Sequence, residues 1–155
     1  MLGMEMVDSA NVIPAPMRDD HILEAYAALA HLSAYYPGFK DWYWTKVVPG
    51  LGTTRRLDIV RREGRIVGVC IAKRTEIERK ICTLWVVPAY RGTGLGVRML
   101  LDAMHWLGTS KPAVTVNEER YLDFVAIFRR LSFQPAKAVV GLYRPGKIEY
   151  LYHCD

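Results

Sequence analysis

The most constraining feature of the sequence is residues 84–96, where an apolar run passes through a glycine-rich turn into a helical pattern. Three glycines, Gly92, Gly94 and Gly96, fall within five residues. Glycine lets the backbone approach a ligand closely, and the first turn of the following helix offers unpaired N–H groups and the positive end of the helix dipole. The sequence therefore predicts a binding site for an anion, and a nucleotide diphosphate is the favoured ligand.

Two common nucleotide-binding motifs do not fit this turn. A dinucleotide-binding fingerprint that began at Gly92 would need a glycine at position 97, where Val97 stands. A Walker loop would need Gly-Lys-Ser or Gly-Lys-Thr after the turn, and neither follows. The alternatives that stay open are another kind of nucleotide site and a glycine-rich connection that binds no ligand.

The turn resembles the signature of the GNAT N-acetyltransferase superfamily, Val-x-Pro-x-x-Arg/Gln-x-x-Gly-x-Gly/Ala. The matching positions are Val86, Pro88, Arg91, Gly94 and Gly96. This resemblance implies that acetyl-CoA is the co-substrate. It also implies that the strand before the turn splays from the next strand of the sheet, and that the pantetheine arm lies in the opening.

Within this resemblance, the strand and the turn share the contacts with acetyl-CoA. Leu84, Trp85 and Val86 are expected to contact the pantetheine arm, and the Val86 amide is expected to polarise the thioester carbonyl. The pyrophosphate site is expected to consist of Arg91, Gly92, Thr93, Gly94, Leu95, Gly96 and Val97. Arg98, one turn further on, either adds to this site or is an ordinary solvated side chain.

The length and composition of the chain are those of one globular domain. The chain has 155 residues, 51% of them hydrophobic, so we expect a single domain over residues 1–155. It contains no apolar run of 18 residues, and its N-terminus lacks a basic segment followed by an apolar one. We therefore expect no membrane span, no secretory signal and a cytoplasmic location.

The cysteines and histidines do not show the spacing of a metal site. Cys70 and Cys82 lie in apolar runs and Cys154 is distant from both, so buried thiols are expected rather than disulfides. We expect no metal cofactor. The net charge of +5 suits an anionic co-substrate or a nucleic-acid partner, although a solvated basic surface gives the same charge.

Strand and helix patterns alternate along the chain without internal repeats. Strands are expected at 56–62, 66–72, 81–87, 112–117, 138–143 and 148–152. Residues 12–17 contain two prolines and are expected to form an edge strand or a loop. Helices are expected from the capping residues Asp19 and Asp20 to Pro37, at 39–44, from 97 to Gly108, and at 118–131. This order matches the GNAT fold, which implies an α/β domain whose mixed, mostly antiparallel sheet is flanked by helices.

Acetyl transfer needs a base for the acceptor amine, and Glu76 and Glu78 are the candidates. Glu78 is the expected base, because the even-numbered residues from 78 to 86 share one face of a regular strand, which directs Glu78 along the groove. A β-bulge would change this assignment. The alternative is that both glutamates are ordinary surface charges.

The family pattern does not assign the acid that protonates the leaving thiolate. GNAT enzymes often carry Asn-x-x-Ala-x-x-x-Tyr on the last helix, and counting back from Phe133 puts Phe128 at the tyrosine position. Phenylalanine cannot donate a proton. Tyr121, two turns earlier on the same helix face, is the expected acid, and Tyr143 and an ordered water are its competitors. The alternative for Tyr121 is an amphipathic core residue.

Six aromatic residues lie between Tyr35 and Trp44, where the resemblance puts the acceptor-binding helix and loop. They either stack on a planar substrate or pack in the core. We expect an enzyme that moves an acetyl or short acyl group to a primary amine by direct attack, without a covalent intermediate on a cysteine. The alternatives are a toxin-type enzyme acting on aminoacyl-tRNA, a nucleic-acid-modifying enzyme and a CoA-binding module without catalysis. The acceptor, the acyl chain and the oligomeric state, including a homodimer, stay open.

Overall fold

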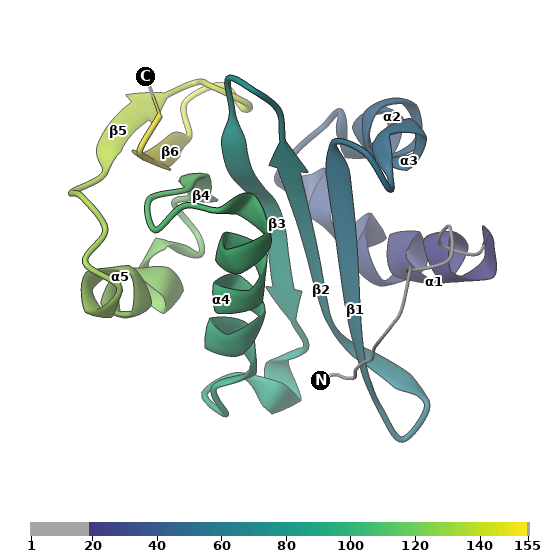
Figure 1. Cartoon of the computed structure of the whole chain (residues 1–155). Coiled ribbons are helices and arrows are strands. Elements are labelled where there is room, and N and C mark those ends of the chain that lie inside the picture. The colour runs from purple at the N-terminus through teal and green to yellow at the C-terminus, as the bar shows by residue number, and fades with distance from the viewer. Residues whose placement is uncertain (1–18, 155) are drawn as a thin grey trace.

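A six-stranded mixed sheet forms the centre of the computed structural model, which describes residues 19–154 (Figure 1). The strands are β1 (Arg55–Arg62), β2 (Arg65–Arg74), β3 (Arg79–Val86), β4 (Ala113–Asn117), β5 (Lys137–Val140) and β6 (Ile148–Tyr152). Their order across the sheet is β1-β2-β3-β4-β6-β5, and only the β3–β4 pairing in this described part is parallel. The expected α/β fold class is confirmed. The edge strand or loop expected at 12–17 lies outside the described residues.

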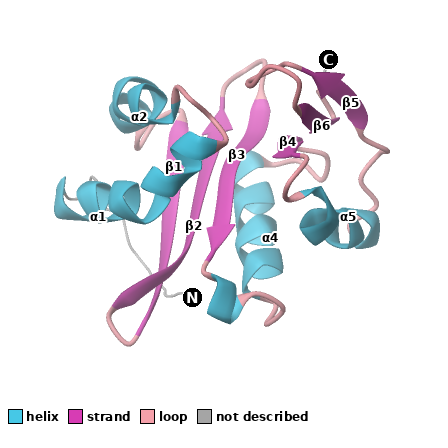
Figure 2. Cartoon of the chain, turned by 180° about the vertical axis from the view of Figure 1, so that it is seen from behind, coloured by secondary structure: helices cyan, strands magenta, loops and turns pink. Residues whose placement is uncertain are grey.

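Helices cover both faces of this sheet. In Figure 1, α4 lies in front of β3, whereas Figure 2, from behind, shows α1 in front of β1 and β2. The helical segments are α1 (Asp19–Leu29), η1 (Ala30–Ala34), α2 (Phe39–Trp42), η2 (Tyr43–Val47), α3 (Val48–Gly50), η3 (Pro88–Tyr90), α4 (Leu95–Leu107) and α5 (Tyr121–Arg130). No helix within residues 19–154 combines the length and apolar character needed to span a membrane.

Each face of the sheet has its own hydrophobic core. One core joins α4 and α5 to β2, β3 and β4, and Leu100 and Phe128 are among its buried side chains. The other joins α1 and the helical segments after it to β1 and β2, and includes Leu29 and Tyr43. Full burial of one such side chain contributes about 1.5–3 kcal/mol, so the two cores fix the helical layers against the sheet.

Several elements end at other residues than the sequence predicts. The helix expected at 39–44 continues through a π-helical turn to Gly50. The helix expected at 118–131 begins at Tyr121, because Asn117 Oδ1 accepts a hydrogen bond from the Arg120 amide at 2.9 Å and holds a turn there. Strand β5 ends before Gly141, whose φ of +80° does not fit a strand.

A β-bulge interrupts β3. Ile71 of β2 pairs with Thr83, and the next residue, Ala72, pairs with Ile81. Cys82 is therefore the extra residue of β3. An extra residue exchanges the two faces of a strand, because side chains alternate with a period of two.

The exchange is visible in the packing of β3. Cys82 and Trp85 pack against the core on the α1 face, whereas Leu84 and Val86 pack on the α4 face. The expectation that the even-numbered residues from 78 to 86 share one face is therefore wrong. The bulge lies between the two halves of that set.

Candidate active site

The parallel strands β3 and β4 separate after a short contact. Lys80 pairs with Ala113 and Ile81 with Val114, and no further pair of these two strands occurs within residues 19–154. A groove lies in the opening. Its lining includes Leu84, Trp85, Thr115, Val116, Phe124 and Phe128. The splayed strands expected from the sequence are present.

The backbone at the end of β3 is aimed into this groove. The Val87 amide donates a hydrogen bond to the Val67 carbonyl of β2 at 2.9 Å. Successive peptide groups of a strand point to opposite edges, so the Val86 amide points toward β4. Arg91 Nε donates to the Val86 carbonyl at 2.9 Å and holds this strand end in place. The opening between β3 and β4 therefore has a fixed backbone donor at the end of β3 that leads into the glycine-rich turn.

The glycine-rich turn closes one end of the groove and leads into α4. Gly92 and Gly94 have φ values of +78° and +88°, and a Cβ at either residue would meet no atom within 4 Å. Glycine is therefore favoured at both positions by the backbone conformation and not by crowding from neighbouring atoms. We call the cavity of about 600 Å³ at this turn the glycine-turn cavity. The residues of the turn and helix start that line it are Arg91, Gly92, Thr93, Gly94, Gly96 and Val97.

Leu95 differs from its neighbours in the turn. Its side chain is only 6% exposed and belongs to the core under α4. Only the backbone of Leu95 is thus available to a ligand at the start of α4. The unpaired amides of that first turn are the part of the helix that suits an anion.

Arginine side chains give the glycine-turn cavity a positive lining. Arg91 comes from the turn, and Arg120 and Arg130 come from the other wall around α5. Asp123 also lines the cavity and forms an ion pair with Arg120, with an Nε–Oδ2 distance of 2.6 Å. Arg98 is exposed and does not line it. Sequence reasoning missed Arg120 and Arg130, because the fold rather than a local motif brings them to the turn.

A second cavity, of about 390 Å³, lies at the other end of the groove, and we call it the aromatic cavity. Tyr36, Phe39 and Trp42 from the predicted aromatic run line it, together with Tyr143. Tyr43 is instead fully buried, and its hydroxyl donates to the Ile22 carbonyl at 2.7 Å. The aromatic run thus divides between a cavity wall and the core.

The groove joins the two cavities. It shares Leu84, Arg120 and Phe124 with the glycine-turn cavity. The residues that line both the groove and the aromatic cavity are Tyr36, Cys82, Thr83 and Thr115. The three hollows therefore form one continuous path along β3.

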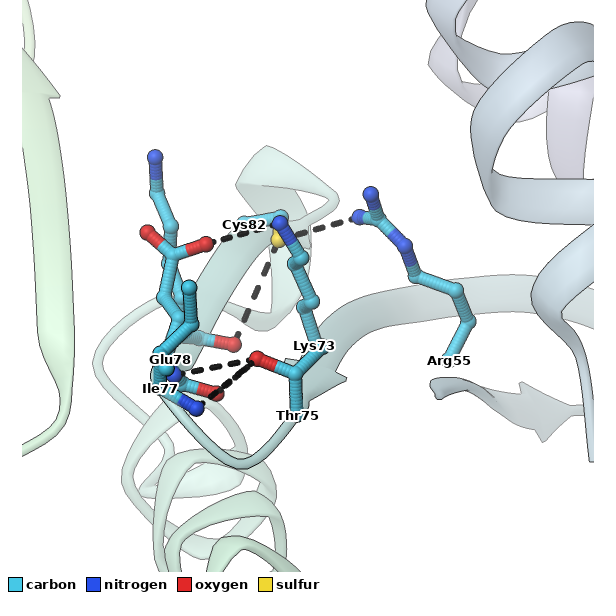
Figure 3. A network of polar contacts seen from close by, with 7 residues as sticks. Arg55, Lys73, Thr75, Ile77, Glu78 and Cys82 are labelled. Carbon is cyan, nitrogen blue, oxygen red and sulfur yellow. Dashed lines mark hydrogen bonds and ion pairs between the residues drawn. The ribbon is translucent and has the colours of Figure 1, made fainter. Parts of the chain in front are cut away.

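Glu78, the expected base, lines the aromatic cavity just before β3 begins. Its Oε1 lies 2.8 Å from Lys73 Nζ, and Figure 3 shows the two side chains facing each other. The hydrogen bond from Lys73 lowers the pKa of Glu78 below its ordinary value. Glu78 is therefore ionised at neutral pH, and its intrinsic basicity is weakened. Glu76 does not line this cavity.

Tyr121, the expected acid, is the first residue of α5 and lines none of these three hollows. Its ring stacks on Tyr150 with 3.8 Å between centroids, and its hydroxyl interacts with Tyr152. Phe128 lines the groove and is 2% exposed. Tyr143 lines the aromatic cavity and is 41% exposed. Tyr121 and Tyr143 are the two tyrosines that the sequence analysis considers as the acid, and of these the fold brings Tyr143 to the aromatic cavity.

A buried polar cluster that the sequence did not reveal holds Tyr36 at the junction of groove and aromatic cavity. The Tyr36 hydroxyl donates to Glu149 Oε1 at 3.0 Å and accepts from Asn117 Nδ2 at 3.5 Å. Glu149 and Asn117 stand opposite each other on β6 and β4 and are both buried. Burial raises the pKa of Glu149 and of Tyr36. The cluster fixes the Tyr36 ring in the cavity wall.

The thiols are less uniformly buried than the sequence suggested. Cys70 is 1% exposed, whereas Cys82 and Cys154 are partly exposed, and no disulfide joins them in the described residues. At the start of α1, the side chains of Asp20, His21 and Glu24 lie within 4.8 Å of one another. Glu24 there also pairs with Arg61. This surface cluster lines neither the groove nor the cavities.

Comparisons with known proteins agree with this geometry. The family model of the acetyltransferase (GNAT) domain matches residues 55–143. No curated protein sequence matches the chain. A protein from Desulfovibrio desulfuricans described as a GNAT-family acetyltransferase has a similar structure, with a TM-score of 0.67 and 15% identity over 88% of this chain and 92% of that chain.

Two further solved structures share the fold. The ribosomal-protein-S18-alanine N-acetyltransferase from Escherichia coli has a TM-score of 0.62 and 16% identity over 87% of each chain. An aminoglycoside 6'-N-acetyltransferase complexed with coenzyme A has a TM-score of 0.63 and 12% identity, over 87% of this chain and 90% of that chain. The family model spans more than half of the sequence. The chain is therefore a GNAT-type acetyltransferase and belongs to the family that its glycine-rich turn resembles.

Proposed function

We propose that the protein transfers an acetyl or short acyl group from acetyl-CoA to the nitrogen of a primary amine by direct attack. The observation that carries the proposal is the continuous path along β3, with a glycine-lined anion site at one end and an aromatic cavity at the other. A solved structure of similar fold contains coenzyme A, which supports acetyl-CoA as the co-substrate.

The co-substrate fits the residues along this path. The pyrophosphate is expected at the first amides of α4 and beside Arg91, and the pantetheine arm between β3 and β4. The open edge of β3 offers backbone groups to an extended amide chain, as an added strand would use them. Leu84, Trp85 and Val86 then contact the arm, and Arg120 lies where the two parts meet.

The chemistry needs a donor for the developing oxyanion. The amine nitrogen attacks the thioester carbonyl carbon, a C–N bond forms, and the C–S bond breaks when the tetrahedral intermediate collapses. The Val86 amide is the proposed donor, since a fixed N–H beside a developing oxyanion stabilises the transition state. Burial raises the pKa of the Cys82 thiol, which disfavours the thiolate and agrees with attack by the amine itself.

The two proton transfers are assigned to different side chains. Glu78 is the proposed base, acting through water, because its carboxylate is ionised and lines the cavity but is paired with Lys73. For the thiolate, Tyr121 remains a prediction, and its stacking on Tyr150 favours Tyr143 in its place. A thiol pKa of about 8.5 also allows protonation by water.

Three further proposals concern the cellular location, the oligomeric state and the metal requirement of the protein. We keep a cytoplasmic location and a possible homodimer as expectations, and propose no metal requirement. Cell fractionation and the molar mass in solution measure the first two. Activity that survives a strong chelator checks the third.

Acetyl-CoA binding and turnover test the proposed function together. We expect calorimetry to give at least micromolar affinity for CoA, and thermal stability to rise with CoA concentration, because a ligand of the folded state stabilises it by mass action. We further expect release of free CoA thiol when primary amines are supplied. No binding at millimolar CoA overturns the proposal. Binding without turnover across a broad amine panel leaves a CoA-binding module in its place.

A further inference from the structure

We propose that the acceptor is a small primary amine that also carries a carboxylate, and that Arg55 binds this carboxylate in the aromatic cavity. The inference rests on the proposed function, because it identifies the acceptor of that transfer. It is carried by the charges and partners of the described residues around the cavity.

Arg55 is a buried cation that interacts electrostatically with Glu78 but forms no direct ion pair with a carboxylate of the described residues. It is 8% exposed, lines the aromatic cavity and begins β1. Its Nη1 donates to Cys82 Sγ at 3.5 Å (Figure 3). Its guanidinium lies 5.6 Å from the centroid of the Trp42 ring. Within residues 19–154, no carboxylate forms an ion pair with it. A buried charge without a counter-ion is costly, so the cavity is suited to a ligand that supplies one.

Arg55 also belongs to a row of three cations on neighbouring strands. In the register of the sheet, Arg55 stands opposite Lys73, and Lys73 stands opposite Lys80. All three line the aromatic cavity. Like charges directly opposite each other destabilise a sheet. Glu78 is the only carboxylate that lines this cavity in the described structure, and it is paired with Lys73.

The charge balance of the cavity therefore favours an anion next to a cation. Arg55 and Lys80 are left to attract an anion, whereas Glu78 favours an ammonium group. A guanidinium binds a carboxylate through two parallel N–H donors, which fixes the orientation of the ligand. Such a ligand is a zwitterion, the chemistry of a free amino acid or a close analogue.

The rest of the lining favours an apolar or aromatic side chain on this amine. Phe39, Trp42, Leu142 and Tyr143 form the apolar wall. The volume of about 390 Å³ lies in the range of small-molecule sites. A cavity of small-molecule size with an apolar wall does not suit an extended polyanion. A nucleic-acid acceptor is therefore the less suitable occupant of this cavity.

The reaction then balances without any further reactant. The neutral amine nitrogen of the amino acid attacks the thioester carbon, the C–N bond forms and the C–S bond breaks. The nitrogen loses a proton to the base, and the CoA thiolate takes up a proton. The carboxylate on Arg55 is unchanged throughout, so Arg55 acts only in binding and orientation.

Matched acceptors measure the role of Arg55. Phenylalanine is compared with phenylalaninamide and phenethylamine, and the other amino acids are each compared with their amides. For the wild type we expect kcat/KM to favour the best acid over its amide by about tenfold to a hundredfold, the range of one charged hydrogen-bonded contact. In Arg55→Gln this ratio should fall to about twofold. In Arg55→Lys it should be intermediate, because the positive charge stays but the two parallel N–H donors are lost.

Arg62→Gln is the matched control. Arg62 ends the same strand, is exposed and lines neither cavity, so the acid-to-amide ratio should stay that of the wild type. A wild-type ratio near one, or an equal ratio in Arg55→Gln and wild type, overturns the inference. So does a faster reaction with an aminoalkyl phosphate than with its carboxylate counterpart, or turnover of aminoacyl-tRNA without turnover of any free amino acid.

Binding separates failure of this inference from failure of the proposed function. The same amino acids and amides are titrated into the protein with CoA present, and affinity is followed by calorimetry and thermal melting. Tighter binding of an amino acid than of its amide, lost in Arg55→Gln and kept in Arg62→Gln, supports the inference even if no amine is acetylated. No binding of any amino acid at millimolar concentration overturns it, even if other amines are acetylated.

Discussion

The two cavities along β3 are built from different parts of the protein. The glycine-turn cavity takes its glycines and backbone amides from one short stretch, residues 91–97, and its other wall from the residues around α5. The aromatic cavity uses residues that come from α2, from four strands and from the loops that follow η1, β2 and β5. A backbone site recognises what every acyl-CoA has in common, whereas a side-chain site can change with the acceptor. The proposed donor site therefore depends largely on a local stretch of the chain, whereas the proposed acceptor site depends on how the fold brings distant residues together.

The largest effect is expected from a substitution that disrupts the glycine-turn cavity. Gly94→Glu puts a side chain on a residue with φ of +88° and a negative charge at the start of α4, where the pyrophosphate is expected. We expect the affinity for acetyl-CoA to fall by about a thousandfold or more in calorimetry. Gly64→Glu is the control, because Gly64 has φ of +77° but lines neither cavity. An equal loss in both variants would assign the effect to backbone strain.

The next effect belongs to the aromatic cavity alone. Glu78→Gln removes the proposed base and keeps its size, so turnover should fall by about a hundredfold while CoA affinity is preserved. The loss should shrink as pH rises, because the amine then deprotonates unaided. Since Lys73 lowers the pKa of Glu78, the pH profile of the wild type near neutrality should follow the amine. Glu76 lies outside the cavity, so Glu76→Gln should have the turnover of the wild type. Equal turnover in the wild type, Glu76→Gln and Glu78→Gln would mean that Glu78 is an ordinary surface charge.

A smaller effect compares two tyrosines. Tyr143→Phe should lower turnover by about tenfold or more, and Tyr121→Phe should stay within about twofold of the wild type, because only Tyr143 lines the aromatic cavity. The opposite order would make Tyr121 the acid. If both variants stay within about twofold, the thiolate is protonated without a dedicated side chain.

The smallest effect contrasts two glutamates in the pH dependence of stability. Burial raises the pKa of Glu149, so its contribution is present at low pH and is lost as pH rises through its folded-state pKa. Arg144 lowers the pKa of Glu119 to about 2, so its contribution is present above the ordinary range and is lost as pH falls toward that value. Relative to the wild type, Glu149→Gln should gain melting temperature as pH rises above the ordinary glutamate range, whereas the deficit of Glu119→Gln should be complete above that range and should shrink as pH falls toward about 2. Parallel shifts in both variants would contradict these assignments.

The sequence predicts the fold and the glycine-rich turn well, because the information for both is local in the chain. The order of strands and helices and the turn after Val86 follow from local pattern and turn chemistry, and the GNAT fold is confirmed. The signals at Gly92 and Gly94 also arise within a few residues, since positive φ values favour glycine there.

The sequence predicts the acceptor side poorly, because register decides it. The bulge at Cys82 depends on how β3 pairs with β2, and no local sequence pattern predicts it. Arg55 reads as an ordinary strand-end charge, and only the pairing of β1, β2 and β3 aligns it with Lys73 and Lys80. Glu149 likewise reads as an exposed strand residue until Asn117 and Tyr36 are placed around it.

A crystal structure with bound CoA is the most direct test of the proposed acetyl-CoA site. We expect the pantetheine arm to lie between β3 and β4, its sulfur end to lie near the Val86 amide, and the pyrophosphate to contact the amides that follow Gly92 and Gly94. CoA bound at another surface, or an opening between β3 and β4 that stays empty at saturating CoA, would contradict it.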